Sequence, residues 1–199
     1  MCEGKSGHPA FMLGSPTPEI VPRMKQKIAV LALPLLAAAT VTGAALVAAP
    51  AYADELRCAG SLGATTVDDD LVVASGTTCR LNGTRVEGNI EVKSGATLIA
   101  SGVRVDGNIQ GENFTRVVVK PRKGDRSRVD GNIQLEDGGK GRIVRSVVDG
   151  DIQLEDNAGR FVVRRNVVDG NLQCEDNSVR PVGNRNRVAG DKEGQCRRM

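Results

Sequence analysis

Histidine, tyrosine and tryptophan are almost absent from this chain of 199 residues. It has one His, one Tyr and no Trp, and only 2% of its residues are aromatic. His8 and Tyr52 both fall in the first quarter, so residues 54–199 contain neither, and their aromatic residues are Phe114 and Phe161. Without His or Tyr, only a carboxylate with a shifted pKa could act as a general base near neutral pH. The composition therefore argues against an enzyme, although carboxylate pairs leave glycoside hydrolysis open on residue types.

Several known patterns are also missing. No window shows the apolar period of 3.6 residues that predicts an amphipathic helix. The sequence lacks the leucine spacing of leucine-rich repeats and the GGxGxDxUx motif of calcium-binding β-helices. It also lacks the regular threonine rows of an ice-binding face. These absences argue against helices, leucine-rich repeats and an ice-binding face, and they weaken the case for a calcium-binding β-helix.

The first quarter has the pattern of a targeting segment. From Met24 it has a short basic start, a long apolar stretch and the motif Ala-Tyr-Ala ending at Ala53. This order predicts a signal peptide at 24–53, cleaved after Ala53, and hence a secreted or extracellular domain at 54–199. A retained membrane anchor is the alternative. Residues 1–23 do not fit a signal peptide, and we interpret them as a mis-called N-terminal extension.

Removal of the expected leader changes the charge balance. Residues 1–53 hold four of the 27 basic residues and two of the 24 acidic ones, so the remainder has 23 basic and 22 acidic residues. The net charge of the mature domain is then about +1, and the pI of 8.7 comes largely from the leader. The basic pI is therefore no argument for nucleic-acid binding. We expect no membrane association after cleavage.

A short pattern recurs through the mature domain: apolar, acidic, Gly, Asn or Asp, Ile or Leu, Gln or Glu. It reads VEGNIE from Val86 and VDGNIQ from Val105, and a degenerate earlier copy, VDDDLVV, starts at Val67. Successive glycines are 19, 24, 19, 20 and 20 residues apart, and we expect them to form tight corners because glycine tolerates positive φ. These structural glycines are Gly88, Gly107, Gly131, Gly150, Gly170 and Gly190.

Each unit holds two or three short strands separated by polar corners. One unit cannot bury its apolar edge alone, so equivalent strands must stack into parallel sheets around a continuous core. The sequence thus predicts an all-β fold, a single-stranded parallel β-helix of about seven coils of 19–24 residues. The variable coil length favours a right-handed helix over a left-handed hexapeptide helix. An insertion of about five residues near Lys120–Gly124 explains the longest spacing and should form a loop at one corner.

Two resemblances follow from these motifs. The V-x-G-N/D-I element resembles that of bactofilins, the polymer-forming β-helical cytoskeletal proteins of bacteria. The mature domain as a whole resembles small secreted actinobacterial repeat proteins of unassigned function, through CRLNGTRVEGNIEVKSGATL from Cys79, GNLQCEDN from Gly170 and EGQC from Glu193. The second resemblance implies a secreted repeat fold and brings no catalytic residue. Bactofilins are cytoplasmic and lack these cysteines, so their polymerisation does not carry over.

The mature domain has four cysteines, Cys58, Cys79, Cys174 and Cys196. An even number in an exported protein indicates disulfides, and four cysteines allow three pairings. Cys58 and Cys79 are 21 residues apart, and Cys174 and Cys196 are 22 apart, each about one coil. We therefore predict these two pairs as clamps at the two ends of the solenoid. The alternative is a metal site, which the absence of His and CxxC spacing disfavours.

Stacking turns each repeated polar residue into a row. We expect an amide row of Asn89, Asn108, Asn132 and Asn171, interrupted by Asp151, and a second of Gln110, Gln134, Gln153 and Gln173. One acidic row is Glu87, Asp106, Asp130, Asp149 and Asp169. A second is Glu136, Glu155 and Glu175, beside the weak metal candidates Asp137, Asp156 and Asp176. Such rows attract Ca²⁺ or basic neighbours. We expect Arg85, Arg104 and Arg128 to compensate the first row, and Arg142, Arg145, Arg160, Arg164 and Arg165 the second.

The sequence favours a secreted structural or interaction protein of the bacterial envelope or exterior, without catalysis or cofactor. Its partner is not identified by the sequence; envelope components and self-association are the options we weigh, and nucleic acid is not expected. A calcium- or glycan-binding protein is the alternative, and a polysaccharide-degrading β-helix enzyme comes last.

Overall fold

The structure is a computed structural model that describes residues 55–199. The proposed extension at 1–23, the signal peptide at 24–53 and the expected new N-terminus, Asp54, lie outside the described residues. Strands begin at Leu56, the third residue after the expected cleavage site. The described part consists of strands and turns. It contains no helix with the length and apolar character needed to cross a bilayer.

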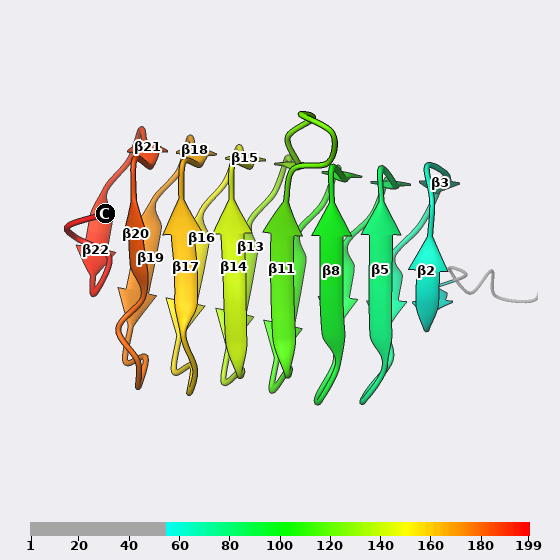
Figure 1. The fold of residues 1–199 in the computed structure, drawn as a ribbon, viewed down its shortest axis with the longest axis horizontal. Coiled ribbons are helices and arrows are strands. Elements are labelled where there is room, and N and C mark those ends of the chain that lie inside the picture. The colour runs from blue at the N-terminus through cyan, green and yellow to red at the C-terminus, as the bar shows by residue number, and fades with distance from the viewer. Residues whose placement is uncertain (1–54) are drawn as a thin grey trace, which may run out of the picture. The chain divides into compact units, whose positions relative to one another are not determined.

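The strands form three parallel sheets that run through the whole of the described part, which confirms the all-β parallel β-helix (Figure 1). Each coil supplies one strand to each sheet. Sheet A contains β1 (Leu56–Cys58), β4 (Leu71–Val73), β7 (Ile90–Val92), β10 (Ile109–Glu112), β13 (Ile133–Glu136), β16 (Ile152–Glu155), β19 (Leu172–Glu175) and β22 (Lys192–Gly194). Sheet B contains β2 (Gly60–Leu62), β5 (Thr78–Asn82), β8 (Thr97–Ser101), β11 (Arg116–Lys120), β14 (Lys140–Val144), β17 (Phe161–Arg164) and β20 (Val182–Asn184). Sheet C contains the two-residue strands β3 (Thr66–Val67), β6 (Arg85–Val86), β9 (Arg104–Val105), β12 (Arg128–Val129), β15 (Val147–Val148), β18 (Val167–Val168) and β21 (Arg187–Val188).

The helix is right-handed, as the variable coil length indicates. In Figure 1 the chain advances from cyan on the right to red on the left. The strands of sheet B run upward in front and those of sheet A run downward behind them. A chain that rises in front and descends behind while it advances to the left follows a right-handed path.

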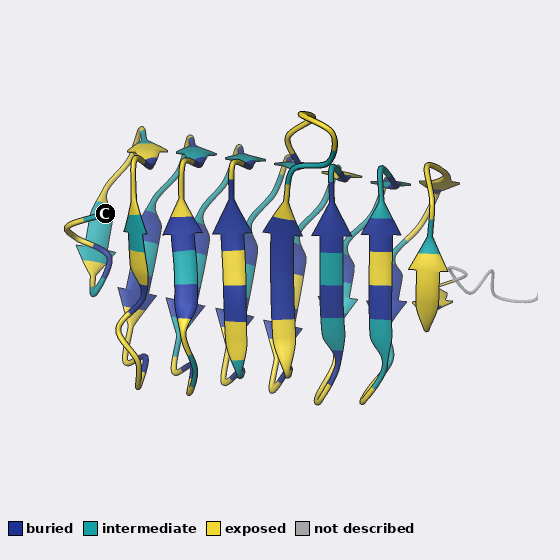
Figure 2. Ribbon diagram, in the orientation of Figure 1, coloured by how far each residue is buried: buried dark blue, intermediate teal, exposed yellow. Residues whose placement is uncertain are grey.

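The core consists of stacked identical or similar side chains. Ile90, Ile109, Ile133, Ile152 and Leu172 are register partners in sheet A, as the repeat predicts, and all are fully buried. The degenerate first copy belongs to the same column, because Leu71 pairs with Ile90. Figure 2 shows the resulting pattern, with buried and exposed residues alternating along strands such as β14. Because each column repeats at about 4.8 Å, one coil buries the apolar edge of the next.

The glycines of the repeat are essential for a reason that differs from our prediction. All six lie in the described part of the chain, and none of them has positive φ. The ability of glycine to adopt positive φ is therefore not the reason for glycine at these positions. The corners instead approach each other too closely for any side chain. A Cβ on Gly107 would lie 2.5 Å from the Asn89 Oδ1 and 2.7 Å from the Gly88 carbonyl oxygen of the preceding coil. The Gly107 N–H donates to that same carbonyl at 3.1 Å, and the contact recurs up to Gly190.

The insertion forms a loop at the corner between sheets B and C, as expected (Figure 1). Its tip is a tight turn in which the Arg122 and Asp125 backbones exchange two hydrogen bonds of 2.9 Å. Lys123 (φ 48°) and Gly124 (φ 101°) occupy the left-handed positions of this turn. At the base of the loop the Ser127 hydroxyl donates to the Lys120 carbonyl at 2.8 Å. The extra residues therefore leave the register of the three sheets unchanged.

Two disulfides close the ends, with the predicted pairing Cys58–Cys79 and Cys174–Cys196. All four cysteines are buried in the core. The C-terminal end has a further cap, a turn that places Met199 against the core. In the same turn the Gln195 side chain accepts from the Asn177 N–H at 3.2 Å and donates to its carbonyl at 2.9 Å. Disulfides persist in oxidising compartments, so the fold indicates an extracellular environment.

Candidate functional site

The asparagine row at the corner between sheets C and A is longer than predicted. Each side-chain Oδ1 accepts from the backbone N–H of the equivalent residue in the next coil. The row runs without interruption from Asp70, Asn89, Asn108, Asn132, Asp151 and Asn171 to Asp191, with N–O distances of 2.6–2.9 Å. Asp151 continues it, contrary to our expectation, because the position needs an acceptor and a carboxylate supplies one as well as an amide does.

Two further rows consist of buried asparagines that the sequence analysis missed. Asn157 and Asn177 line the corner between sheets A and B, and Asn166 and Asn186 the corner between sheets B and C. The Asn166 Oδ1 accepts from the Ser146 N–H at 3.0 Å, and its Nδ2 donates to the Ile143 carbonyl at 2.9 Å. Such pairing satisfies backbone groups that the corners would otherwise bury unpaired. The 20-residue recurrence of Glu-Asp-Asn and of Arg-Asn was the available signal.

The glutamine row on the outer face of sheet A is present as predicted. Gln110 donates to Gln134 at 2.9 Å, Gln134 to Gln153 at 2.7 Å and Gln153 to Gln173 at 2.8 Å. Gln173 donates in turn to the Glu193 carboxylate at 2.9 Å. All four donors point toward the C-terminal end. The chain of bonds thereby stabilises the stack, and it engages one N–H of every glutamine in the row.

The first acidic row is compensated in part by arginines of sheet C. Arg85 pairs with Asp106 of the next coil at 2.5 Å and contacts Glu87 at 3.4 Å. Arg128 pairs likewise with Asp149 at 3.2 Å. Arg104, which we expected to act in the same way, forms no ion pair within residues 55–199. Exposed pairs of this kind contribute about 0–1 kcal/mol each.

The second acidic row lies on sheet A and includes one residue more than predicted. Glu112, Glu136, Glu155 and Glu175 are consecutive register partners. Burial raises the pKa of Glu155, and the carboxylates of Glu136 and Glu175 raise it further. At the following corner Asp137, Asp156 and Asp176 have left-handed backbones, with φ of 48–53°. No group of three or more acidic, His or Cys side chains in residues 55–199 has a geometry that could hold a metal ion.

The arginines that we expected beside this acidic row lie elsewhere. Arg142 and Arg164 are on strands of sheet B, and Arg145 and Arg165 occupy the next corner. None of these four, nor Arg160, forms an ion pair within the described part of the chain. These arginines are close to the glutamates in sequence but not in the structure, because the corner after each sheet A strand turns the chain into sheet B. The two charges are therefore segregated, with carboxylates on sheet A and cations on sheet B.

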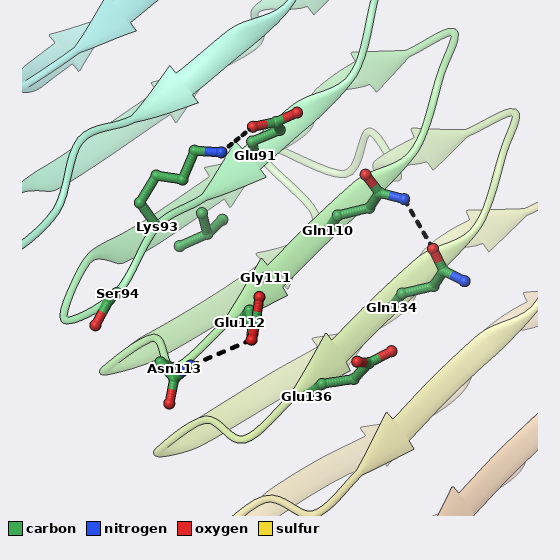
Figure 3. Close-up of a pocket in the computed structure, with 10 residues that line it drawn as sticks. Glu91, Lys93, Ser94, Gln110, Gly111, Glu112, Asn113, Gln134 and Glu136 are labelled. Carbon is green, nitrogen blue, oxygen red and sulfur yellow. Dashed lines mark hydrogen bonds and ion pairs between the residues drawn. The ribbon is translucent and has the colours of Figure 1, made fainter. Parts of the chain in front are cut away.

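Two shallow hollows lie on the outer surface, one on each of these sheets. The hollow on sheet A has a volume of about 370 Å³ (Figure 3). It is lined by the carboxylates of Glu91, Glu112 and Glu136 and by amide side chains. Lys93 pairs with Glu91 there, and Asn113 donates to Glu112 at 3.4 Å. Glu112 and Glu136 are exposed members of the regular row rather than a special pair.

The hollow on sheet B, about 450 Å³, is lined by basic side chains around an apolar floor. Its cations are Arg116, Lys120, Arg142, Arg145, Arg164 and Arg165. Comparison with known proteins adds no assignment to either hollow: no family model matches the chain, and neither a curated protein nor a solved structure matches it.

Proposed function

We propose that this chain is an exported, non-catalytic structural or interaction protein of the bacterial envelope or exterior. The observation that carries the proposal is the regularity of the outer surface. The polar positions of most coils repeat those of their neighbours, and Glu112 and Glu136 of the sheet A hollow belong to such a row. An enzyme needs a few groups placed differently from all others, whereas a repeated surface favours contact with an extended partner.

Export is the first part of the proposal, and it rests on the disulfides and the leader pattern. We expect mass spectrometry of the culture medium of the native host to find a form that begins at Asp54. Recovery of only the full-length chain, with reduced cysteines, from the cytoplasm would overturn export.

Interaction with the envelope is the second part. Disulfide-bonded protein should sediment with isolated envelope fractions, and release by salt would indicate an ionic contact. A matched sample with reduced and alkylated cysteines tests whether binding to the envelope requires the disulfide-closed ends of the solenoid. Absence of sedimentation at low salt would argue against an envelope role while leaving export intact.

Calcium binding is the second candidate, favoured by the acidic row on sheet A. Burial raises the pKa of Glu155 and the carboxylates of Glu136 and Glu175 raise it further, so a divalent cation close to the row would favour the charged form of Glu155. Calcium at millimolar concentration should then raise the melting temperature, and magnesium should raise it less. An equal, small effect of both ions would indicate simple screening of charge.

A further inference from the structure

The outer face of sheet B is strongly basic on its fourth to sixth strands, β11, β14 and β17. Strands β11, β14 and β17 lie side by side and contain no acidic residue (Figure 1). We call the six exposed cations on or next to the sheet B hollow the basic face: Arg116, Lys120, Arg142, Arg145, Arg164 and Arg165. Within residues 55–199 none of the six has an ion-pair partner, in contrast to Arg85 and Arg128 on sheet C.

The floor of the hollow is apolar. Val118 and Val144 line it, with exposed fractions of 4% and 6%. Both lie outside the core cluster, whereas Val117 and Val119 belong to it, so strand alternation places Val118 on the outer face. Arg and Lys side chains flank this floor, and residues of these types commonly pack their aliphatic stems on apolar surface while their charged ends stay in water.

The corner arginines occupy a backbone conformation that suits glycine. Arg145 and Arg165 have φ of 51° and 58°. Register places them in the column of Gly83, Gly102 and Pro121, and the two glycines have φ of 75° and 59°. A long side chain in the left-handed region is disfavoured relative to glycine. Arginine thus recurs at this corner in successive coils although glycine fits the backbone conformation better.

We propose that the basic face binds an extended linear polyanion that lies along the solenoid axis and carries phosphate or carboxylate groups. This rests on the proposed function and names the class of partner. Cations occur in three successive coils, whose strands lie about 4.8 Å apart, and Arg145 and Arg165 are neighbours in one column. This arrangement suits a chain of repeated charges better than a single small anion. Arginine binds phosphate and carboxylate through paired hydrogen bonds, and five of the six cations are arginine.

Nucleic acid is the less suitable polyanion. Proteins that hold single strands stack bases on exposed aromatic rings. In residues 55–199 the aromatic side chains are Phe114 and Phe161, and both are buried. We therefore commit to a polymer without bases, such as a phosphodiester-linked or uronate-type chain of the envelope.

The first test measures binding of the disulfide-bonded protein to two probes, linear inorganic polyphosphate and polygalacturonate, over a range of salt concentrations. Polyphosphate carries phosphate and polygalacturonate carboxylate, so the stronger ligand identifies the preferred group. The variant Arg142→Gln/Arg164→Gln/Arg165→Gln removes three charges from the basic face. Its control, Arg57→Gln/Arg104→Gln/Arg187→Gln, removes three charges from other exposed positions.

We expect the basic-face variant to bind at least about 10-fold more weakly and to lower the slope of log K against log salt by about 2, since each contact with a flexible chain contributes about 0.7. The control should bind like the wild type. Equal weakening of both variants would overturn the proposal, because the attraction would then be one of net charge alone. Tighter binding of double-stranded DNA or of anionic lipid vesicles than of either probe would also overturn it.

A second variant guards against loss of the fold. Arg145→Gly/Arg165→Gly introduces the residue that the same column already has at Gly83 and Gly102, so the melting temperature should not fall. Polyphosphate or polygalacturonate binding should nevertheless weaken. Unchanged binding of this folded variant would contradict the role of the corner arginines. If both basic-face variants still sediment with envelopes as the wild type does, this inference fails while the proposed function stands.

Discussion

Glycine and its Asn or Asp neighbour at each corner between sheets C and A act as a pair. The glycine lets two coils approach, and the neighbouring side chain fills the space beside it with a hydrogen bond to the next coil. The spacing of the glycines was evident in the sequence, but the reason for them was not. A local pattern suggests a turn, whereas contact with the coil below depends on residues 19–24 positions away.

The close approach predicts a large effect of a single methyl group. In Gly131→Ala the new Cβ would overlap the Gly107 carbonyl, 2.8 Å away, and the Asn108 side chain. We expect a loss of about 2–3 kcal/mol in the free energy of unfolding, typical of overpacking. Gly63→Ala is the control, because its Cβ would meet nothing within 4 Å. Urea unfolding of residues 54–199 measures both; equal effects would disprove the steric explanation.

Glu155 predicts a pH dependence of stability. Its pKa is raised in the folded state, so protonation favours folding: the contribution is fully present below the unfolded pKa and is lost as pH rises through the folded pKa. Glu155→Gln should therefore stabilise the domain by about 0.5 kcal/mol at pH 7, within the range for opposed like charges. The gain should vanish at acidic pH, where the wild-type residue is protonated. Thermal melts at pH 7 and at pH 3.5 compare the two; a gain of equal size at both would refute the electrostatic cause.

The polar rows determine how neighbouring coils align, and they were only partly evident from sequence. The glutamine row follows from identical residues in register, and it is present. Asp151 was predicted to interrupt the Asn row, but it continues the row. The prediction considered only the type of residue, whereas the position requires a hydrogen-bond acceptor, which Asp also has. The arginines of sheet B were predicted to lie beside the acidic row of sheet A. The sequence pattern did not show that a short corner separates the two sheets at this point.

The row at the corner between sheets C and A predicts different effects for two substitutions of one residue. The Asp151 Oδ1 accepts from the Asn171 N–H at 2.6 Å. Asp151→Asn keeps the acceptor and should change the free energy of unfolding by less than about 0.5 kcal/mol. Asp151→Leu removes it and should cost about 1–3 kcal/mol, because an N–H remains unpaired. Denaturant unfolding tests this, and similar effects of the two substitutions would count against a structural role for the acceptor.

The molecule is a stack in which each coil contacts mainly its two neighbours, so its stability is distributed along one axis. The number of coils, the parallel sheets and both disulfides were predicted from the recurrence of residues and the spacing of cysteines. The segregation of charge between sheets A and B was not, since it depends on where each corner turns the chain. The two ends have one neighbour each, and there the disulfides replace the missing contacts.

Reduction should therefore loosen the ends first. We expect faster amide exchange at 58–73 and at 177–195 after reduction, while 105–154 stays protected longest. Each closed loop is worth about 3 kcal/mol in the chain-entropy model. Exposed sheet edges should also promote end-to-end association, which light scattering detects. Uniform exchange along the chain after reduction would indicate a single cooperative unit.

The corner contact also has an evolutionary consequence. Because the Gly and Asx positions hold successive coils in register while the loop at 121–126 takes up surplus residues, a whole coil is the natural unit of gain or loss. Duplication of the gene segment that encodes one coil would add one residue to each core column and one residue to each polar row of the outer surface. The length of the rod, and with it the number of charges it displays, can thus change by recombination without any new core having to be selected.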